Sequence, residues 1–246
     1  MAAILSWLND NEAQKWLNDN QGVVSAAIFL LTALFGWASG IFGALRRKPK
    51  LKLAIIPGPT LCTTFTTGAK HGDFPVHRTA LSLYLRVSNV GTAATSIENV
   101  SLGYHWYLRP RFTFEWVRYR LFWYWLDQPA ITMTDFQADV GQHIKIYPSL
   151  FQGSATTGRS TDVYLQAGQS VNGVVYFEQR DSWGGFMPFP KSHRTRVKVA
   201  VKDVFGTHHK QCFWIPVVPL AEAQKYNPSF GQTYHSLQQE GGKAGA

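Results

Sequence analysis

The feature that most constrains this chain is an uncharged apolar run of 23 residues, from Val23 to Leu45. A helix rises about 1.5 Å per residue, so a run of this length covers the roughly 30 Å hydrocarbon core of a bilayer. We therefore predict one transmembrane helix over residues 22–45, preceded by a short amphipathic segment over residues 1–21.

The charges on the two sides of this run predict its orientation. The first 20 residues carry a net charge of −2, whereas residues 46–52, RRKPKLK, carry +5. Basic flanks stay on the cytoplasmic side, so we expect a single-pass protein of the inner (plasma) membrane with its N-terminus outside and its C-terminal domain in the cytoplasm. A cleaved signal peptide is the alternative, although it needs a basic start and a shorter apolar core. In the basic linker 46–52, the cations expected to contact anionic lipid headgroups are Arg46, Arg47 and Lys48.

Small residues recur at every fourth position of the run, at Thr32, Gly36, Gly40 and Ala44. On a continuous helix this spacing stacks them into one ridge, which lets two helices approach closely in lipid. We predict self-association into a homo-oligomer through this ridge. The alternative is that glycine is simply frequent in membrane helices.

Behind the anchor the chain is long enough for one sizeable domain, and its pattern is that of β-strands. In RTALSLYLRVSNVG, Leu81, Leu83 and Leu85 alternate with polar residues, and RTRVKVAVKD shows the same period of two. Seven or eight short strands without a βαβ rhythm are typical of an antiparallel sandwich. We place this sandwich at residues 53–218.

The segments LYLRVSNVGTAATSIENVSL, LQAGQSVNGVVYFE and VKVAVKDVFG resemble the strand pairs of bacterial immunoglobulin-like β-sandwich modules. The resemblance implies a mainly β fold: an N-terminal transmembrane helix followed by an immunoglobulin-like antiparallel β-sandwich with an aromatic-rich helical insertion. It implies no activity, because one fold carries many functions. In layout alone, the chain is similar to small bacterial antiphage membrane effectors.

The insertion over residues 104–150 begins with the most unusual composition in the chain. Eleven of the 23 residues from 104 to 126 are aromatic, and four arginines are interleaved with them. Because Pro110 interrupts any single element, we expect a strand up to Leu108 and then a helix over residues 112–126. The residues expected to form its surface are Arg111, Trp116, Arg118, Tyr119, Arg120 and Trp123.

Three interpretations of this insertion remain open. It lies on the inner leaflet, where tryptophan and arginine suit anionic headgroups. Alternatively it binds nucleic acid or a nucleotide by stacking and phosphate contacts, which we favour less, or its aromatic stripe is core packing.

Two further segments complete the organisation. In the Gly/Pro loop RDSWGGFMPFPKSHR, Trp183, Phe186 and Phe189 are candidates for binding a protein partner, unless they pack onto the end of the sandwich. Residues 219–246 are expected to form a short helix and a disordered tail.

The sequence contains no phosphate-binding loop, zinc-ligand spacing or nucleophile elbow. Cys62 and Cys212 are expected to be free thiols, and the adjacent pair His208 and His209 is a poor chelate in an expected turn. We therefore predict no cofactor, no metal and no enzymatic activity.

Three hypotheses about function follow. The chain is a non-enzymatic membrane-anchored effector or sensor whose sandwich binds a partner or ligand, with a role in antiphage defence. Alternatively it is a scaffold that tethers a partner protein to the membrane, or it binds nucleic acid or nucleotides at the membrane.

Overall fold

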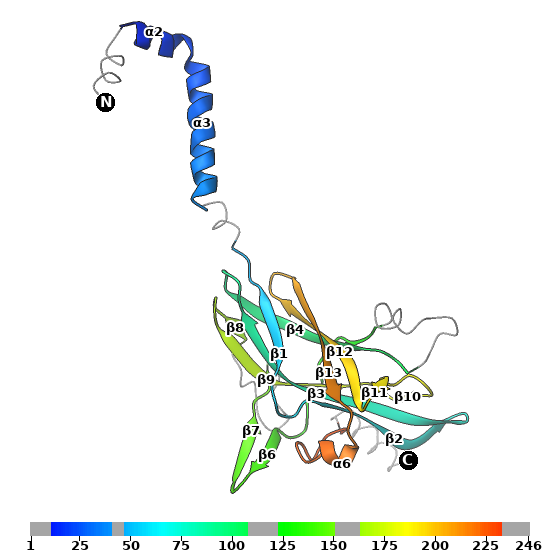
Figure 1. The fold of residues 1–246 in the computed structure, drawn as a ribbon. Coiled ribbons are helices and arrows are strands. Elements are labelled where there is room, and N and C mark those ends of the chain that lie inside the picture. Colours follow the sequence, from blue (N-terminus) through cyan, green and yellow to red (C-terminus); the bar gives the residue numbers. More distant parts are fainter. Residues whose placement is uncertain (1–10, 41–46, 108–122, 151–162, 233–246) are drawn as a thin grey trace. The chain divides into compact units, whose positions relative to one another are not determined.

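A computed structural model describes residues 11–40, 47–107, 123–150 and 163–232, with the side chains of residues 11–14 left out (Figure 1). The chain divides into two compact units, residues 1–47 and residues 48–246, and each is described by itself. Strands account for 51% of the residues and helices for 15%, which confirms the expected mainly β class.

Unit 1 consists of helix α2 (Asn11–Asp19) and helix α3 (Gln21–Ala38). Helix α3 is long and apolar enough to cross a membrane, and none of its side chains is buried. Its 18 residues span about 27 Å. It ends earlier than expected, because the chain turns at Ser39 and Gly40, where Gly40 has a φ of 74°.

This turn corrects the expected ridge of small residues. Thr32 and Gly36 are one turn apart within α3, where the Thr32 hydroxyl donates to the Ile28 carbonyl at 2.8 Å. Gly40 instead lies beyond the end of the helix in the left-handed conformation that glycine adopts readily. Ala44 lies outside the described residues. The ridge within α3 is therefore half as long as expected.

Unit 2 is built from antiparallel strands. In chain order they are β1 (Leu51–Ile55), β2 (Leu61–His71), β3 (Phe74–Asn89), β4 (Thr95–Tyr104), β5 (Tyr124–Leu126), β6 (Phe136–Val140), β7 (His143–Tyr147), β8 (Tyr164–Leu165), β9 (Ser170–Glu178), β10 (Ser182–Trp183), β11 (Pro190–Lys191), β12 (Arg194–Asp203) and β13 (His208–Pro216). A short helix, α6 (Leu220–Ala223), follows β13.

These strands form two main sheets and one hairpin. In the first sheet the long strand β3 pairs with β1 and β2, and with β9 and β10. In the second sheet β12 pairs with β13, β11 and β4, and β4 in turn pairs with β5 and β8. Strands β6 and β7 form a separate two-stranded hairpin.

The two sheets share one apolar core, and the predicted alternation accounts for it. Leu81, Leu83 and Leu85 of β3 are fully buried, as are Val197 and Val199 of β12. All five belong to one continuous cluster that draws on both sheets. The inward-facing residues predicted from the period of two are therefore confirmed.

The other face of β3, which carries the alternating polar residues, is also covered along part of its length. Ser82 is fully buried and Tyr84 is only 8% exposed. A second core cluster covers this face, in which Phe136 and Tyr147 of the β6–β7 hairpin pack with Phe230 near the C-terminus. The middle of β3 is thus buried on both faces, because the insertion and the C-terminal segment form a third layer.

The expected helix over residues 112–126 is wrong at its C-terminal end. Residues 124–126 form β5, which pairs with β4 so that Gly103 lies opposite Trp125. A Cβ atom at Gly103 would lie 3.1 Å from the Trp125 indole, so glycine leaves the room that this ring occupies. Residues 108–122 lie outside the described residues.

The expected basic linker is partly built into unit 2. Lys52 lies in β1, and the Lys48 and Lys50 carbonyls accept hydrogen bonds from Thr92 and Val90 at 3.1 and 2.8 Å. A Cβ atom at residue 91 would lie 2.4 Å from the Lys48 carbonyl oxygen, so this close approach needs glycine. The chain therefore enters unit 2 at a defined place beside the β3–β4 turn.

Candidate binding surfaces

The outer face of the second sheet carries cations and aromatic rings that come from β5, β12 and β13 and from the residues next to β4 and β5. The register places Arg196 opposite Trp214, and Lys198 opposite both Cys212 and Gly103. Since Val197 points into the core, its neighbours Arg196 and Lys198 point outward. We call this surface the basic aromatic face, and it consists of His105, Trp123, Trp125, Arg196, Lys198, Lys210 and Trp214.

Trp123 is the centre of the face. Its ring centroid lies 3.8 Å from that of His105, 4.2 Å from Lys198 Nζ and 5.7 Å from the Arg196 guanidinium carbon. Cations within about 6 Å of an indole centroid are attracted by its π-electrons. The Arg196 and Lys198 side chains are both half-buried, so the Trp123 ring holds their positive charges at fixed positions on the sheet.

The rest of the face extends this arrangement toward β13. Lys210 is exposed and its Nζ lies 6.0 Å from the Trp125 ring, while the Trp214 side chain is 43% exposed. The face therefore presents three positive charges at its surface beside an accessible indole. Such a surface can bind an anionic partner through charge and an apolar contact together.

The Gly/Pro loop, the predicted partner-binding site, is attached to the end of β4. Tyr107 donates its backbone N–H to the Met187 carbonyl at 2.7 Å, and Phe189 donates to the His105 carbonyl at 2.8 Å. Residue 106 also bridges to residue 188 in antiparallel fashion. The loop therefore continues the sheet beyond β4.

Its aromatic rings mostly pack on the unit itself, in agreement with the alternative interpretation. The Phe186 ring lies edge-on to Trp106 with centroids 4.8 Å apart, and Phe189 lies 5.6 Å from Tyr107. Trp183 stacks on His71 at 4.0 Å and stays 38% exposed. Of the three predicted residues, Trp183 presents the most surface to a partner.

A buried polar cluster holds this loop in place. The Phe186 carbonyl accepts hydrogen bonds from the Ser182 hydroxyl at 2.9 Å and from the Gln179 amide at 3.0 Å. Tyr104 donates to the Gln179 amide oxygen, and His77 Nε2 lies 3.1 Å from Ser182 Oγ. The cluster satisfies the loop's buried carbonyl, which explains why these polar residues lie next to the core.

Ser182 and His77 have the residue types of a nucleophile and its base, but their geometry serves structure. The Ser182 hydroxyl donates to a backbone carbonyl, so its proton is not directed at the imidazole. Both residues are also buried. Within the described part of the chain, no group of three or more His, Cys, Asp or Glu residues could hold a metal ion.

The remaining predicted site residues are distributed as follows. Arg47 and Lys48 are exposed, at the junction between the two units. The residues that lie outside the described part of the chain are Ala44, Arg46, Arg111, Trp116, Arg118, Tyr119 and Arg120. The structure thus places Trp123 on the second sheet, whereas the rest of the predicted membrane-surface set is untested.

Comparison with known proteins identifies no family. No protein-family model matches the chain, and neither does any curated protein. A solved structure of an inactive mutant of the GH20 exo-β-N-acetylglucosaminidase from Vibrio harveyi aligns with 70% of this chain at 11% identity and a TM-score of 0.16. The chain spans 18% of that enzyme's length.

Sequence reasoning missed the basic aromatic face as a unit. The outward positions of Arg196 and Lys198 followed from the strand period, and the aromatic content of residues 104–126 was evident. Their meeting depends on the β4–β12 pairing, which joins segments about 100 residues apart. The period of two in β12 predicted which of its residues point outward, but it does not predict which strand pairs with β12.

Proposed function

We propose that the chain is a non-enzymatic, membrane-anchored effector or sensor. Helix α3 anchors it in the inner membrane, and an immunoglobulin-like sandwich in the cytoplasm receives a partner on the basic aromatic face. The observation that carries this proposal is the placement of Lys198, Arg196 and Lys210 over the Trp123 and Trp125 rings. A role in antiphage defence is part of the proposal and rests on layout alone.

The chemistry of the face favours an acidic segment of a partner protein. The Trp123 ring already contacts His105, Lys198 and Arg196, so the cations rather than the indole surface meet an incoming ligand. A nucleic acid would use accessible aromatic surfaces for base stacking. Trp214, at 43% exposure, offers one such ring beside the cations.

A charge-matched pair of variants tests the proposal. Lys198→Gln with Lys210→Gln removes two cations of the face, and Lys70→Gln with Arg86→Gln removes two exposed cations of the first sheet. We expect binding of a poly-glutamate peptide to full-length protein in detergent to weaken roughly tenfold in the first variant only. Equal losses in both variants would contradict a specific site, and tighter binding of a single-stranded oligonucleotide of equal charge would favour a nucleic-acid partner.

The effector role needs a cellular measurement. Expression of the full chain should depolarise cells or lower phage plating, and the Lys198→Gln, Lys210→Gln variant should lose this effect at equal protein level. A stable protein complex recovered from membranes without any leak would indicate a scaffold instead. A periplasmic C-terminal reporter would contradict the cytoplasmic location.

A further inference from the structure

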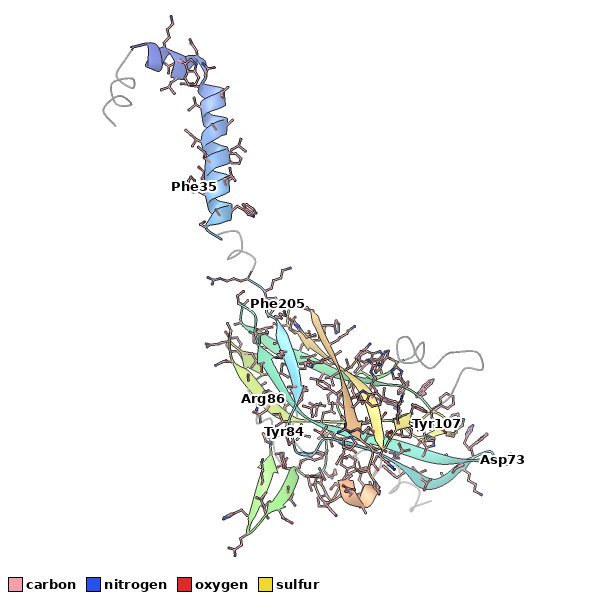
Figure 2. All side chains as sticks on the ribbon, viewed as in Figure 1. Phe35, Asp73, Tyr84, Arg86, Tyr107 and Phe205 are labelled. Carbon is pink, nitrogen blue, oxygen red and sulfur yellow. The ribbon has the colours of Figure 1, made fainter. Side chains whose placement is uncertain are left out.

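Three turns lie at the end of unit 2 where the chain enters β1. They are residues 90–94 between β3 and β4, residues 166–169 between β8 and β9, and residues 204–207 between β12 and β13. Hydrogen bonds place them together: Val90 donates to Lys50, Gly168 donates to Asn89, and Val204 donates to Ser96. Figure 2 shows Phe205 at this end of unit 2, with Tyr107 and Asp73 toward the opposite end.

Large apolar side chains are exposed on two of these turns. Phe205 is 66% exposed, Val204 is 54% exposed and Val90 is 53% exposed. Exposed turns between strands normally carry polar residues, because nothing in the unit covers an apolar group there. Two adjacent apolar residues at the tip of a turn therefore point to a surface that shields them from water.

The turn that carries Phe205 is held rigidly. Oδ1 of the buried Asp203 accepts the backbone N–H groups of Phe205 and Thr207 at 3.0 and 2.9 Å. Gly206 closes the turn with a φ of 79°. The phenyl ring is thus presented outward on a fixed backbone, so its insertion into another phase costs little ordering of the chain.

The charges around this end are mostly positive. Arg47, Lys48, Lys50 and Lys52 are all exposed where the chain enters the unit. Two carboxylates lie near this end: Asp203 is buried and hydrogen-bonded within its own turn, and Glu98 of β4 forms an ion pair with Lys202 at 2.8 Å. Apolar tips surrounded by cations match a lipid surface with anionic headgroups, where phenylalanine enters the acyl boundary and lysine meets phosphate.

The tether limits how far this end can be from the bilayer. Helix α3 ends at Ala38 and unit 2 begins at Lys48, so the intervening chain spans at most about 35 Å even when fully extended. Residues 39–45 are also uncharged, so only Arg46 and Arg47 separate the apolar part of the sequence from the unit. A chain of this length keeps the end that carries Phe205 within reach of the headgroups.

We propose that this end of unit 2 docks on the anionic surface of the membrane that α3 crosses, with Phe205 and Val204 entering the headgroup region. This inference rests on the proposed membrane anchoring. Docking by this end would direct β4 away from the membrane. Tyr104 lies nine residues along β4 from Thr95, so it would be about 30 Å farther from the bilayer. End-on docking therefore keeps Trp123 and its cations available to a cytoplasmic partner.

The test uses full-length protein in proteoliposomes of phosphatidylcholine with 30% phosphatidylglycerol, with Cys212 replaced by serine. An environment-sensitive fluorophore is attached at Thr207→Cys, next to the apolar tip, or at Asp73→Cys, at the far end. We expect lipids with a nitroxide near the headgroup to quench the label at residue 207 at least threefold more than the label at residue 73. Phe205→Ser, or separately Val204→Ser, should remove most of this difference without changing thermal unfolding.

The possible outcomes separate this inference from the proposed function. In one outcome, the protein floats with the vesicles and resists carbonate extraction while the label at residue 207 is not quenched. This result would support the membrane anchor and overturn the docking of unit 2. Stronger quenching at residue 73 would show that the unit lies on its side or points away, and would also overturn it. A label at residue 207 that is shielded from water yet unquenched would indicate a second copy or another protein on this end, which contradicts a lipid contact. Failure to float would contradict the anchor itself.

Discussion

The carboxylate of Asp203 accepts a hydrogen bond from Nε2 of His209 at 2.9 Å, and Nδ1 of the same imidazole accepts the backbone N–H of Leu51 at 3.3 Å. The backbone N–H can only donate, which assigns the histidine proton to Nε2. One imidazole thus joins the β12–β13 turn to the first residue of β1. It ties the entry point of the unit to the turn that carries Phe205.

This relationship predicts an acid-sensitive stability. Burial alone would raise the pKa of Asp203, but hydrogen bonds from His209, Thr207 and Phe205 outweigh it and hold the pKa below its ordinary value. A lowered folded pKa stabilises the protein above the unfolded pKa, and this contribution is lost as the pH falls through the folded value. We expect Asp203→Asn to cost about 2 kcal/mol at pH 7 and to flatten the loss of stability below about pH 4.

Denaturant unfolding of the detergent-solubilised chain between pH 7 and pH 2.5 measures this effect. Asp73→Asn, in an exposed turn, is the matched control and should follow the wild-type curve. Parallel curves for Asp203→Asn and the wild type would show that the buried carboxylate does not contribute.

The two thiols are predicted to differ sharply in reactivity. Cys62 is fully buried, and burial raises its pKa to about 12, whereas Cys212 is half-buried on the basic aromatic face beside Lys198. Because only the thiolate reacts, native protein at pH 8 should expose one reactive thiol to a disulfide reagent, and denatured protein two. Cys212→Ser should abolish the native reaction while Cys62→Ser leaves it, and rapid labelling of Cys212→Ser would contradict the burial of Cys62.

Gly173 is predicted to be the least replaceable residue of β9. A Cβ atom there would lie 2.4 Å from both Cα and N of Leu150, in a segment that hydrogen-bonds β9 through Val174 at 3.0 and 2.7 Å. Backbone atoms cannot move aside as a flexible side chain does, so Gly173→Ala should cost on the order of 3 kcal/mol. Thermal or denaturant unfolding measures this, with the exposed Ser170→Ala of the same strand expected within about 0.5 kcal/mol of wild type. If Gly173→Ala lowered the free energy of unfolding by less than Ser170→Ala does, the close approach of Leu150 would be contradicted.

The shortened ridge in α3 makes a prediction about self-association. Gly36→Ile places a branched side chain one turn from Thr32 and should weaken self-association in membranes roughly tenfold, because small residues permit close helix contact. Leu34→Ile, on the other side of the helix, is the control and should leave it unchanged. Energy transfer between labelled copies reports the change. Gly40 is a poor site for this test, since its positive φ makes any side chain strained.

Local pattern was enough to predict several elements of this chain. The apolar run predicted α3, and the alternation of β3 and β12 predicted the inward residues from Leu81 to Leu85 and from Val197 to Val201. These features depend on neighbours one to four residues away, which is the range that period and hydropathy report.

Other features required contacts between distant segments. The aromatic run before Leu126 has helical spacing, yet residues 124–126 form a strand that pairs with β4. The hydrogen bonds to the β4 backbone and the space above Gly103 outweigh the local preference for a helix. His208 and His209, expected in a turn, begin β13 because they pair with β12.

What the sequence by itself determined is therefore the apolar helix, the basic flank and the inner faces of the sheets, since each depends on local apolar spacing and charge. Only the tertiary structure decided which strands are neighbours. That choice buries the second face of β3 beneath Phe136 and Phe230, brings Trp123 under Lys198, and gathers Val90 and Phe205 at one end. The physical reason is that strand pairing and face packing are long-range contacts, whose partners a period of two does not specify.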